Sequence, residues 1–138
     1  MNVFEKYEKM GKARSFFNEY QQMARLVDDL DTRFWKRFVT RDSRRVLSID
    51  EALSEKTLRR EYQGCVSDML VLREKVNAAL ASVKSDICRD LMTEYFIHDL
   101  DYEEIAVKWR MDEADVCSLI QKGLLEAEIP EGSAHGIV

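Results

Sequence analysis

The sequence predicts an all-α protein in which a long antiparallel helical hairpin is followed by a C-terminal unit of three short helices. Only one proline and five glycines occur among the 138 residues, so few positions interrupt a helix. Apolar side chains recur three and four residues apart along most of the chain, which places them on one helix face. Short capping sequences stand where these helices would begin.

The first helix is predicted by apolar residues that alternate steps of four and three positions: Phe16, Tyr20, Met23, Val27, Leu30 and Phe34. This spacing keeps one apolar seam facing a partner helix. Gly11 is a candidate break between this helix and a short leading one, because glycine costs roughly 1 kcal/mol relative to alanine inside a helix.

The second helix carries a seam with the same spacing, formed by Leu58, Tyr62, Cys65, Met69, Leu72, Val76, Ala79 and Val83. Ser48 and Glu51 have the spacing of a capping box that would start it. The segment from Thr40 to Leu47 lacks a seam and is short enough to make the two helices antiparallel neighbours. A second apolar flank on this hairpin predicts a homodimer; its residues are Phe17, Ala24, Val66 and Leu70.

Three short helices are expected after the hairpin. Ser85 and Asp86 would open the first, whose apolar side is Ile87, Leu91, Met92, Tyr95 and Phe96. Asp101 and Glu104 form a capping box for the next, which runs to Trp109. Asp112 would cap the last, whose buried stripe is Val116, Leu119, Ile120 and Leu124. We therefore expect a hairpin over residues 1–84, a three-helix unit over 85–129 and a flexible tail over 130–138.

The stretch from Leu100 to Leu119 reads LDYEEIAVKWRMDEADVCSL and resembles, without a gap, the helix-turn-helix of sigma-factor promoter-reading domains. In that pattern Ala106 is the small residue where two helices cross, and Met111 fills the turn. The layout of a charged helical front followed by this unit is similar to phage and prophage transcription regulators of the ArpU and RinA type. That resemblance implies promoter binding and contact with RNA polymerase.

The resemblance also implies which residues would meet DNA. The groove-facing candidates on the last helix are Glu113, Ala114, Asp115, Ser118, Gln121 and Lys122. Lys108 and Arg110 are candidate contacts before it. The chain departs from the family at Asp115, a position that is commonly basic, so a phosphate would meet like charge there.

The charge distribution divides the chain. Residues 98–138 hold ten acidic and three basic residues, whereas residues 33–60 hold nine basic and four acidic ones. A phosphate backbone would be attracted to the second segment and repelled by the first. The predicted basic hairpin tip is Arg33, Lys36, Arg37, Arg41, Arg44 and Arg45. These residues either supply electrostatic attraction to DNA or form a solvated charged turn.

Signals for other classes of protein are missing from the sequence. We find no Gly-rich phosphate loop, no zinc-protease motif and no nucleophile beside a histidine, so we expect neither an enzyme nor a cofactor. Three scattered cysteines form no metal motif, and His98 and His135 have no partner at helical spacing, so no metal site is expected. No apolar run approaches the roughly 20 residues of a membrane span, which favours a cytoplasmic protein without a membrane partner.

Two functions stay open on the sequence. The first is a phage-type transcription regulator that binds double-stranded promoter DNA. The second is an acidic helical module that binds RNA polymerase or another regulator without reading DNA. A structural helical oligomer is a third interpretation, which leaves the sigma-like segment without a role.

Overall fold

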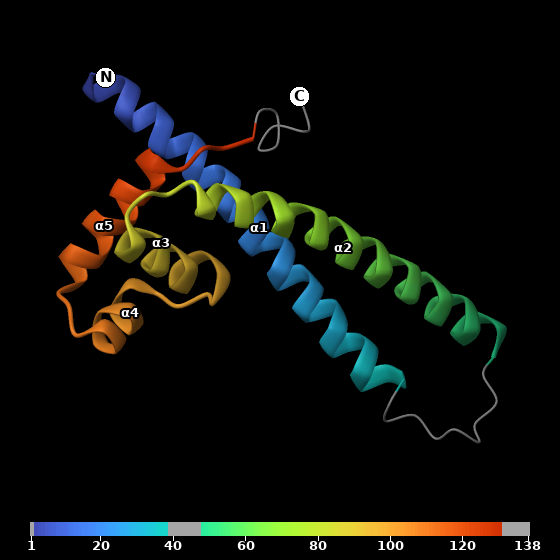
Figure 1. The fold of residues 1–138 in the computed structure, drawn as a ribbon. Helices are drawn as coiled ribbons and strands as arrows, with labels where there is room; N and C mark the ends of the chain where they lie inside the picture. Colours follow the sequence, from blue (N-terminus) through green and yellow to red (C-terminus); the bar gives the residue numbers. More distant parts are fainter. Residues whose placement is uncertain (1, 39–47, 131–138) are drawn as a thin grey trace. The chain divides into compact units, whose positions relative to one another are not determined.

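The computed structural model describes residues 2–38 and 48–130, in which every regular element is a helix, so the predicted all-α class is confirmed (Figure 1). The elements are α1 (Val3–Phe38), α2 (Ile49–Ala81), α3 (Asp86–Met92), η1 (Thr93–Ile97), α4 (Tyr102–Trp109) and α5 (Glu113–Glu126). None of the helices in this part of the chain is both long and apolar enough to cross a membrane.

Helix α1 is continuous, so the predicted break at Gly11 is wrong. A Cβ added at Gly11 would meet nothing within 4 Å, which shows that this position faces open space. The cost of one exposed glycine, about 1 kcal/mol, is too small to interrupt a helix of 36 residues whose buried face packs on other elements.

The start of α2 is confirmed, because Ser48 and Glu51 pair as expected of an N-cap. The Glu51 amide donates to Ser48 Oγ over 3.1 Å, and the Ser48 hydroxyl donates to Glu51 Oε1 over 3.3 Å. The first of these bonds satisfies an amide of the first turn, which has no partner within the helix. The predicted connection over residues 40–47 lies outside the described residues.

The contacts group the chain into two compact units, one of residues 1–21 with 73–138 and one of residues 22–72. This grouping cuts across both long helices. Division of the chain at residues 84 and 129 into independent domains stays a prediction.

The unit of residues 22–72 is held by a polar and aromatic cluster. The Tyr62 hydroxyl donates to Asp31 Oδ1 over 2.9 Å, and its ring stacks on Phe34 with centroids 5.7 Å apart. The Arg59 guanidinium lies 5.8 Å from the centre of the Phe34 ring. The hydrogen bond to Asp31, together with burial and the charge of Asp31, raises the pKa of Tyr62. The predicted seam residues Phe34 and Tyr62 are therefore in contact.

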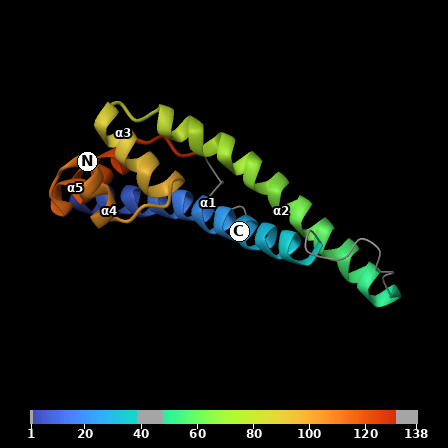
Figure 2. The same ribbon diagram turned by 90° about the horizontal axis from the view of Figure 1, so that it is seen from below.

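The other unit surrounds an apolar core. Residues of α3, η1, α4 and α5 belong to this unit together with the first half of α1 (Figures 1 and 2). The Phe17 ring stacks on Phe96 with centroids 4.8 Å apart, and the Gln21 amide group donates to the Tyr95 carbonyl over 2.7 Å. Phe17 is fully buried, so its predicted place on a free dimer flank is wrong. Leu70 of that flank is 55% exposed, and the homodimer stays a prediction.

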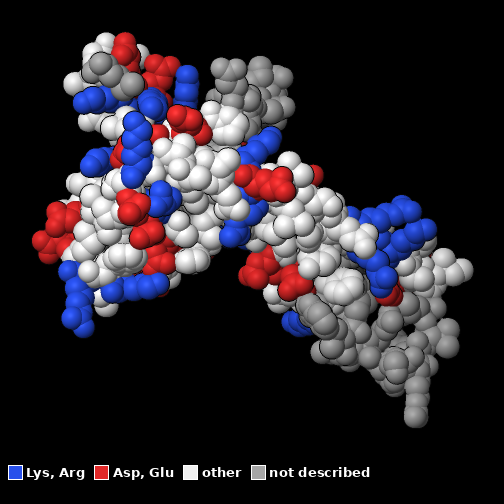
Figure 3. All heavy atoms as spheres, in the orientation of Figure 1, with Lys and Arg blue, Asp and Glu red and all other residues white. Residues whose placement is uncertain are grey.

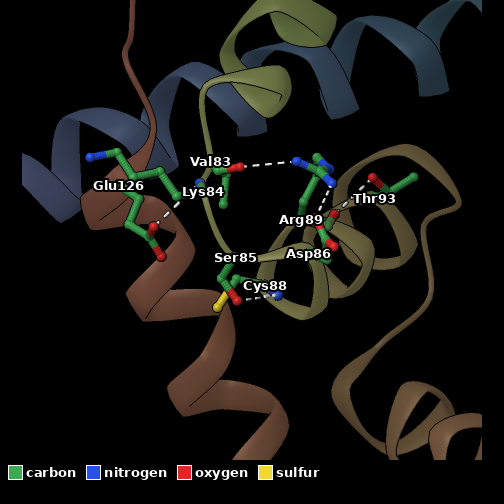
Figure 4. A network of polar contacts seen from close by, with 8 residues as sticks. All are labelled: Val83, Lys84, Ser85, Asp86, Cys88, Arg89, Thr93 and Glu126. Atoms are coloured by element: carbon green, nitrogen blue, oxygen red, sulfur yellow. Dashed lines mark hydrogen bonds and ion pairs between the residues drawn. The ribbon is translucent and has the colours of Figure 1, made fainter.

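The link between α2 and α3 is bonded to the end of α5 (Figure 4). Ser85 caps α3 as predicted, since its Oγ accepts from the Cys88 amide over 3.4 Å. The neighbouring Lys84 amide donates to Glu126 Oε2 over 3.3 Å, which joins the last turn of α5 to this link. The same carboxylate therefore helps to fix where α5 ends relative to α3.

Helix α5 packs closely on α3 at Gly123. A Cβ at this position would overlap the Met92 sulfur and would lie 3.3 Å from Cys88 Cβ, and both side chains are fully buried. The small residue predicted for a helix crossing was Ala106, which is only half-buried. The structure shows a close approach at Gly123, between α5 and α3, whereas the crossing of α4 and α5 at Ala106 stays a prediction.

Two glycine substitutions separate packing from helix propensity. Gly123→Ala is expected to lower the free energy of unfolding by about 1–2 kcal/mol, because overpacking of the α3–α5 contact outweighs the gain in propensity. Gly11→Ala, in open space, is expected to raise it by about 0.5–1 kcal/mol. Urea unfolding measures both, and a stabilised Gly123→Ala variant would contradict the close packing.

Candidate nucleic-acid interface

Helix α4 begins with the predicted capping box. The Glu104 amide donates to Asp101 Oδ1 over 2.8 Å, and the Asp101 amide donates to Glu104 Oε1 over 3.2 Å. The Tyr102 ring stacks on Tyr95 of η1 with centroids 4.8 Å apart, and Arg14 donates to the Tyr102 hydroxyl over 3.4 Å. Burial raises the pKa of Tyr102 more than Arg14 lowers it. The first turn of α4 is therefore fixed to both η1 and α1.

The turn between α4 and α5 consists of Arg110, Met111 and Asp112. Arg110 adopts the left-handed conformation, with φ 54° and ψ 50°, and the Met111 amide donates to the Ala106 carbonyl over 2.9 Å. A residue with a Cβ strains the backbone at such a φ, which favours glycine. Asp112 stands at the N-cap of α5, but its side chain makes no capping hydrogen bond, so that part of the prediction is wrong. Its carbonyl oxygen accepts from the Val116 amide over 3.1 Å.

Helix α5 separates its side chains between two faces. Val116, Ile120 and Leu124 are fully buried, as the predicted stripe requires, and Leu119 is half-buried. The six predicted groove-facing residues are all exposed: Glu113, Ala114, Asp115, Ser118, Gln121 and Lys122. We call these six residues the α5 outer face.

The charge on the α5 outer face is mixed. Glu113 and Asp115 lie in the first turn of α5, where carboxylates interact favourably with the positive end of the helix dipole. Lys122 lies further along the helix, and Arg110 is exposed in the preceding turn. On the face of this unit drawn in Figure 3, basic and acidic side chains are interspersed. A phosphate would therefore meet attraction and repulsion on neighbouring residues.

Lys108, the remaining predicted cation, is paired with a buried acid that the sequence analysis missed. Its Nζ lies 2.5 Å from Oε2 of Glu94, a residue of η1 that is 5% exposed. Trp109 Nε1 donates to the same oxygen over 3.3 Å, and His98 Nδ1 lies 2.6 Å from Glu94 Oε1. The prediction that His98 has no partner at helical spacing is wrong, since Glu94 stands four residues before it. That spacing is the signal by which the pair could have been found.

The Glu94 carboxylate is charged at neutral pH. Burial acts to raise the pKa of Glu94, but hydrogen bonds from Lys108, His98 and Trp109 and the charge of Lys108 outweigh it, so the pKa is lowered. A buried charge is tolerated only where such partners replace the water that it loses. The three donors come from the end of η1 and from the last turn of α4, so one carboxylate joins these elements.

Part of the predicted basic hairpin tip is described. Arg33 forms an ion pair with Asp29 over 2.7 Å, in which both side chains are more than half exposed, and Lys36 is exposed. The side chain of Arg37 and the whole of Arg41, Arg44 and Arg45 lie outside the described residues. An exposed pair such as Arg33 with Asp29 contributes little stability.

Within residues 2–38 and 48–130, no group of three side chains is arranged to hold a metal ion, and Cys65, Cys88 and Cys117 are free thiols. Comparisons of the chain with family models, curated proteins and solved structures found no match. The function of the chain is therefore inferred from the geometry and charge of α4 and α5.

The Glu94 cluster predicts a pH dependence of stability. The pKa of Glu94 is lower in the folded protein than in the unfolded chain. The ionised carboxylate therefore stabilises the fold at every pH above the unfolded-state pKa, and this stabilisation is lost as the pH falls through the folded-state pKa. Glu94→Gln is expected to lower the free energy of unfolding by about 1–3 kcal/mol at pH 7 and by much less at a pH well below the unfolded glutamate pKa of about 4.3. Glu103→Gln, an exposed control on α4, should change it by less than about 0.5 kcal/mol. Equal losses for Glu94→Gln at both pH values would contradict the assignment.

Proposed function

We propose that this protein is a phage- or prophage-type transcription regulator that binds promoter DNA through α4 and α5, with α5 entering the major groove. The observation that carries the proposal is the separation of faces on α5. Three of its four stripe residues, Val116, Ile120 and Leu124, are fully buried, while all six residues of the outer face remain exposed. A recognition helix needs a buried side that holds it and a polar side that reaches base edges.

The residues of the outer face have chemistry suited to duplex DNA. Gln121 has the donor and acceptor that match adenine, Ser118 can donate or accept, and the carboxylates can accept from the amino group of cytosine. Lys108, Arg110 and Lys122 would contact phosphates. Contact with RNA polymerase follows from the same resemblance to ArpU- and RinA-type regulators, and a regulator that binds promoter DNA would act in the cytoplasm.

A second candidate function is supported by the exposed acids around α4 and the start of α5. Seven exposed carboxylates stand between residues 99 and 115, against two basic side chains, Lys108 and Arg110. The carboxylates are those of Asp99, Asp101, Glu103, Glu104, Asp112, Glu113 and Asp115. Such a surface suits a basic protein surface, for instance one on RNA polymerase, better than it suits phosphate.

Salt-dependent binding to duplex DNA tests the first candidate. Anisotropy of a labelled duplex pool is expected to show binding at about 50 mM salt that weakens steeply as salt rises, because counterions are released from phosphates. Lys122→Gln should lower the slope of log Kd against log salt by about 0.9, as expected for one lost phosphate contact. Lys75→Gln, an exposed control on α2, should leave the slope unchanged. Absence of binding at low salt would reject DNA recognition and leave the acidic module.

Substitution of Asp115 distinguishes the two candidates. In a DNA-binding protein, Asp115→Asn removes repulsion from phosphates and is expected to strengthen non-specific duplex binding by about two- to fivefold. In an acidic interaction module, the same change should weaken capture of purified RNA polymerase. Parallel anisotropy and pull-down measurements on the wild type and this variant check both directions.

A further inference from the structure

The buried acid Glu94 contacts Lys108, a residue of the proposed DNA-binding surface. Its side chain is 6% exposed, whereas that of its partner Lys108 is 57% exposed. The pair thus has its negative end inside the protein and its positive end in solvent. Lys108 lies in the last turn of α4, two residues before the turn that leads into α5.

We infer that Glu94 is a positioning residue for DNA binding, which holds the Lys108 ammonium in place for a backbone phosphate. This inference rests on the proposed function. An ammonium has three N–H groups, and a contact with one carboxylate oxygen leaves others for a phosphate. Glu94 would never touch DNA itself, and it acts only through Lys108.

The surrounding contacts make Glu94 a fixed support. His98 holds one carboxylate oxygen over 2.6 Å, and Trp109 donates to the other over 3.3 Å. Since both oxygens are bound, the carboxylate is held in one orientation, and Lys108 Nζ is held with it at 2.5 Å. The titratable or charged groups in contact with the Glu94 carboxylate are therefore His98, at the end of η1, and Lys108, on α4.

Positioning by Glu94 would strengthen DNA binding because the Lys108 side chain loses less rotamer freedom when it contacts a phosphate. A surface lysine on a flexible four-carbon stem loses rotamer freedom when it is fixed against a phosphate. A lysine already fixed in the free protein loses less, which is the ordinary gain from preorganisation. Charge alone predicts the opposite sign, because removal of the Glu94 carboxylate would reduce repulsion from DNA. The direction of the effect therefore separates positioning from simple electrostatics.

The experiment is a double-mutant cycle in duplex binding with Glu94→Gln, Lys108→Gln and the double variant. We expect Glu94→Gln to weaken binding by about three- to tenfold, as for one side chain that must be newly immobilised. Lys108→Gln should lower the slope of log Kd against log salt by about 0.9, and Glu94→Gln should lower this slope by no more than that. In the Lys108→Gln background, Glu94→Gln should cause no further weakening. Glu103→Gln removes the same charge from an exposed position on α4 and should leave binding equal or slightly tighter.

Several results would overturn the inference. If the wild type binds duplex DNA but Glu94→Gln binds as Glu103→Gln does, the inference fails and the proposed function stands. If the wild type binds no DNA at low salt, the proposed function itself fails and the inference fails with it. Circular dichroism identifies a variant that has unfolded. In that case NMR relaxation of the Lys108 side chain in the wild type decides, because a side chain that samples many rotamers contradicts positioning and one held in a single rotamer supports it.

Discussion

The buried carboxylate of Glu94 is the interaction on which the rest of the C-terminal arrangement depends. A charge so far removed from water is tolerated only with close partners, and here these are His98 Nδ1 at 2.6 Å, Lys108 Nζ at 2.5 Å and the Trp109 indole at 3.3 Å. Two of the partners belong to the last turn of α4. Glu94 therefore fixes the end of that helix, and with it the turn from which α5 begins.

The apolar contacts supply the other constraint on α5. At Gly123 the absence of a side chain lets α5 approach Met92 and Cys88 of α3 closely, while Phe17 of α1 stacks on Phe96. The short helices consequently share a core with the first half of α1. Close packing of this kind leaves α5 little freedom to rotate, so the same residues stay turned toward solvent.

The charge of the exposed surface limits what the geometry alone would suggest. The outer face of α5 has the polar groups and the exposure of a reading surface, yet Glu113 and Asp115 stand in its first turn, where the helix dipole favours them. The two carboxylates that stabilise the start of α5 would repel a phosphate. DNA recognition would then depend on a few well-placed cations, and recognition of a basic protein surface would depend on the acids themselves.

The sequence by itself determined the helical class, the capped starts of α2, α3 and α4, and the buried stripe of α5, because caps and periodic faces depend on residues within one or two turns. It also determined which α5 residues would be exposed. Only the tertiary structure decided that Phe17 is buried, that the close crossing lies at Gly123, and that Glu94 binds Lys108 and Trp109. Contacts between residues 14 to 79 positions apart leave no periodic trace in the sequence, since their closeness is created by how the helices pack.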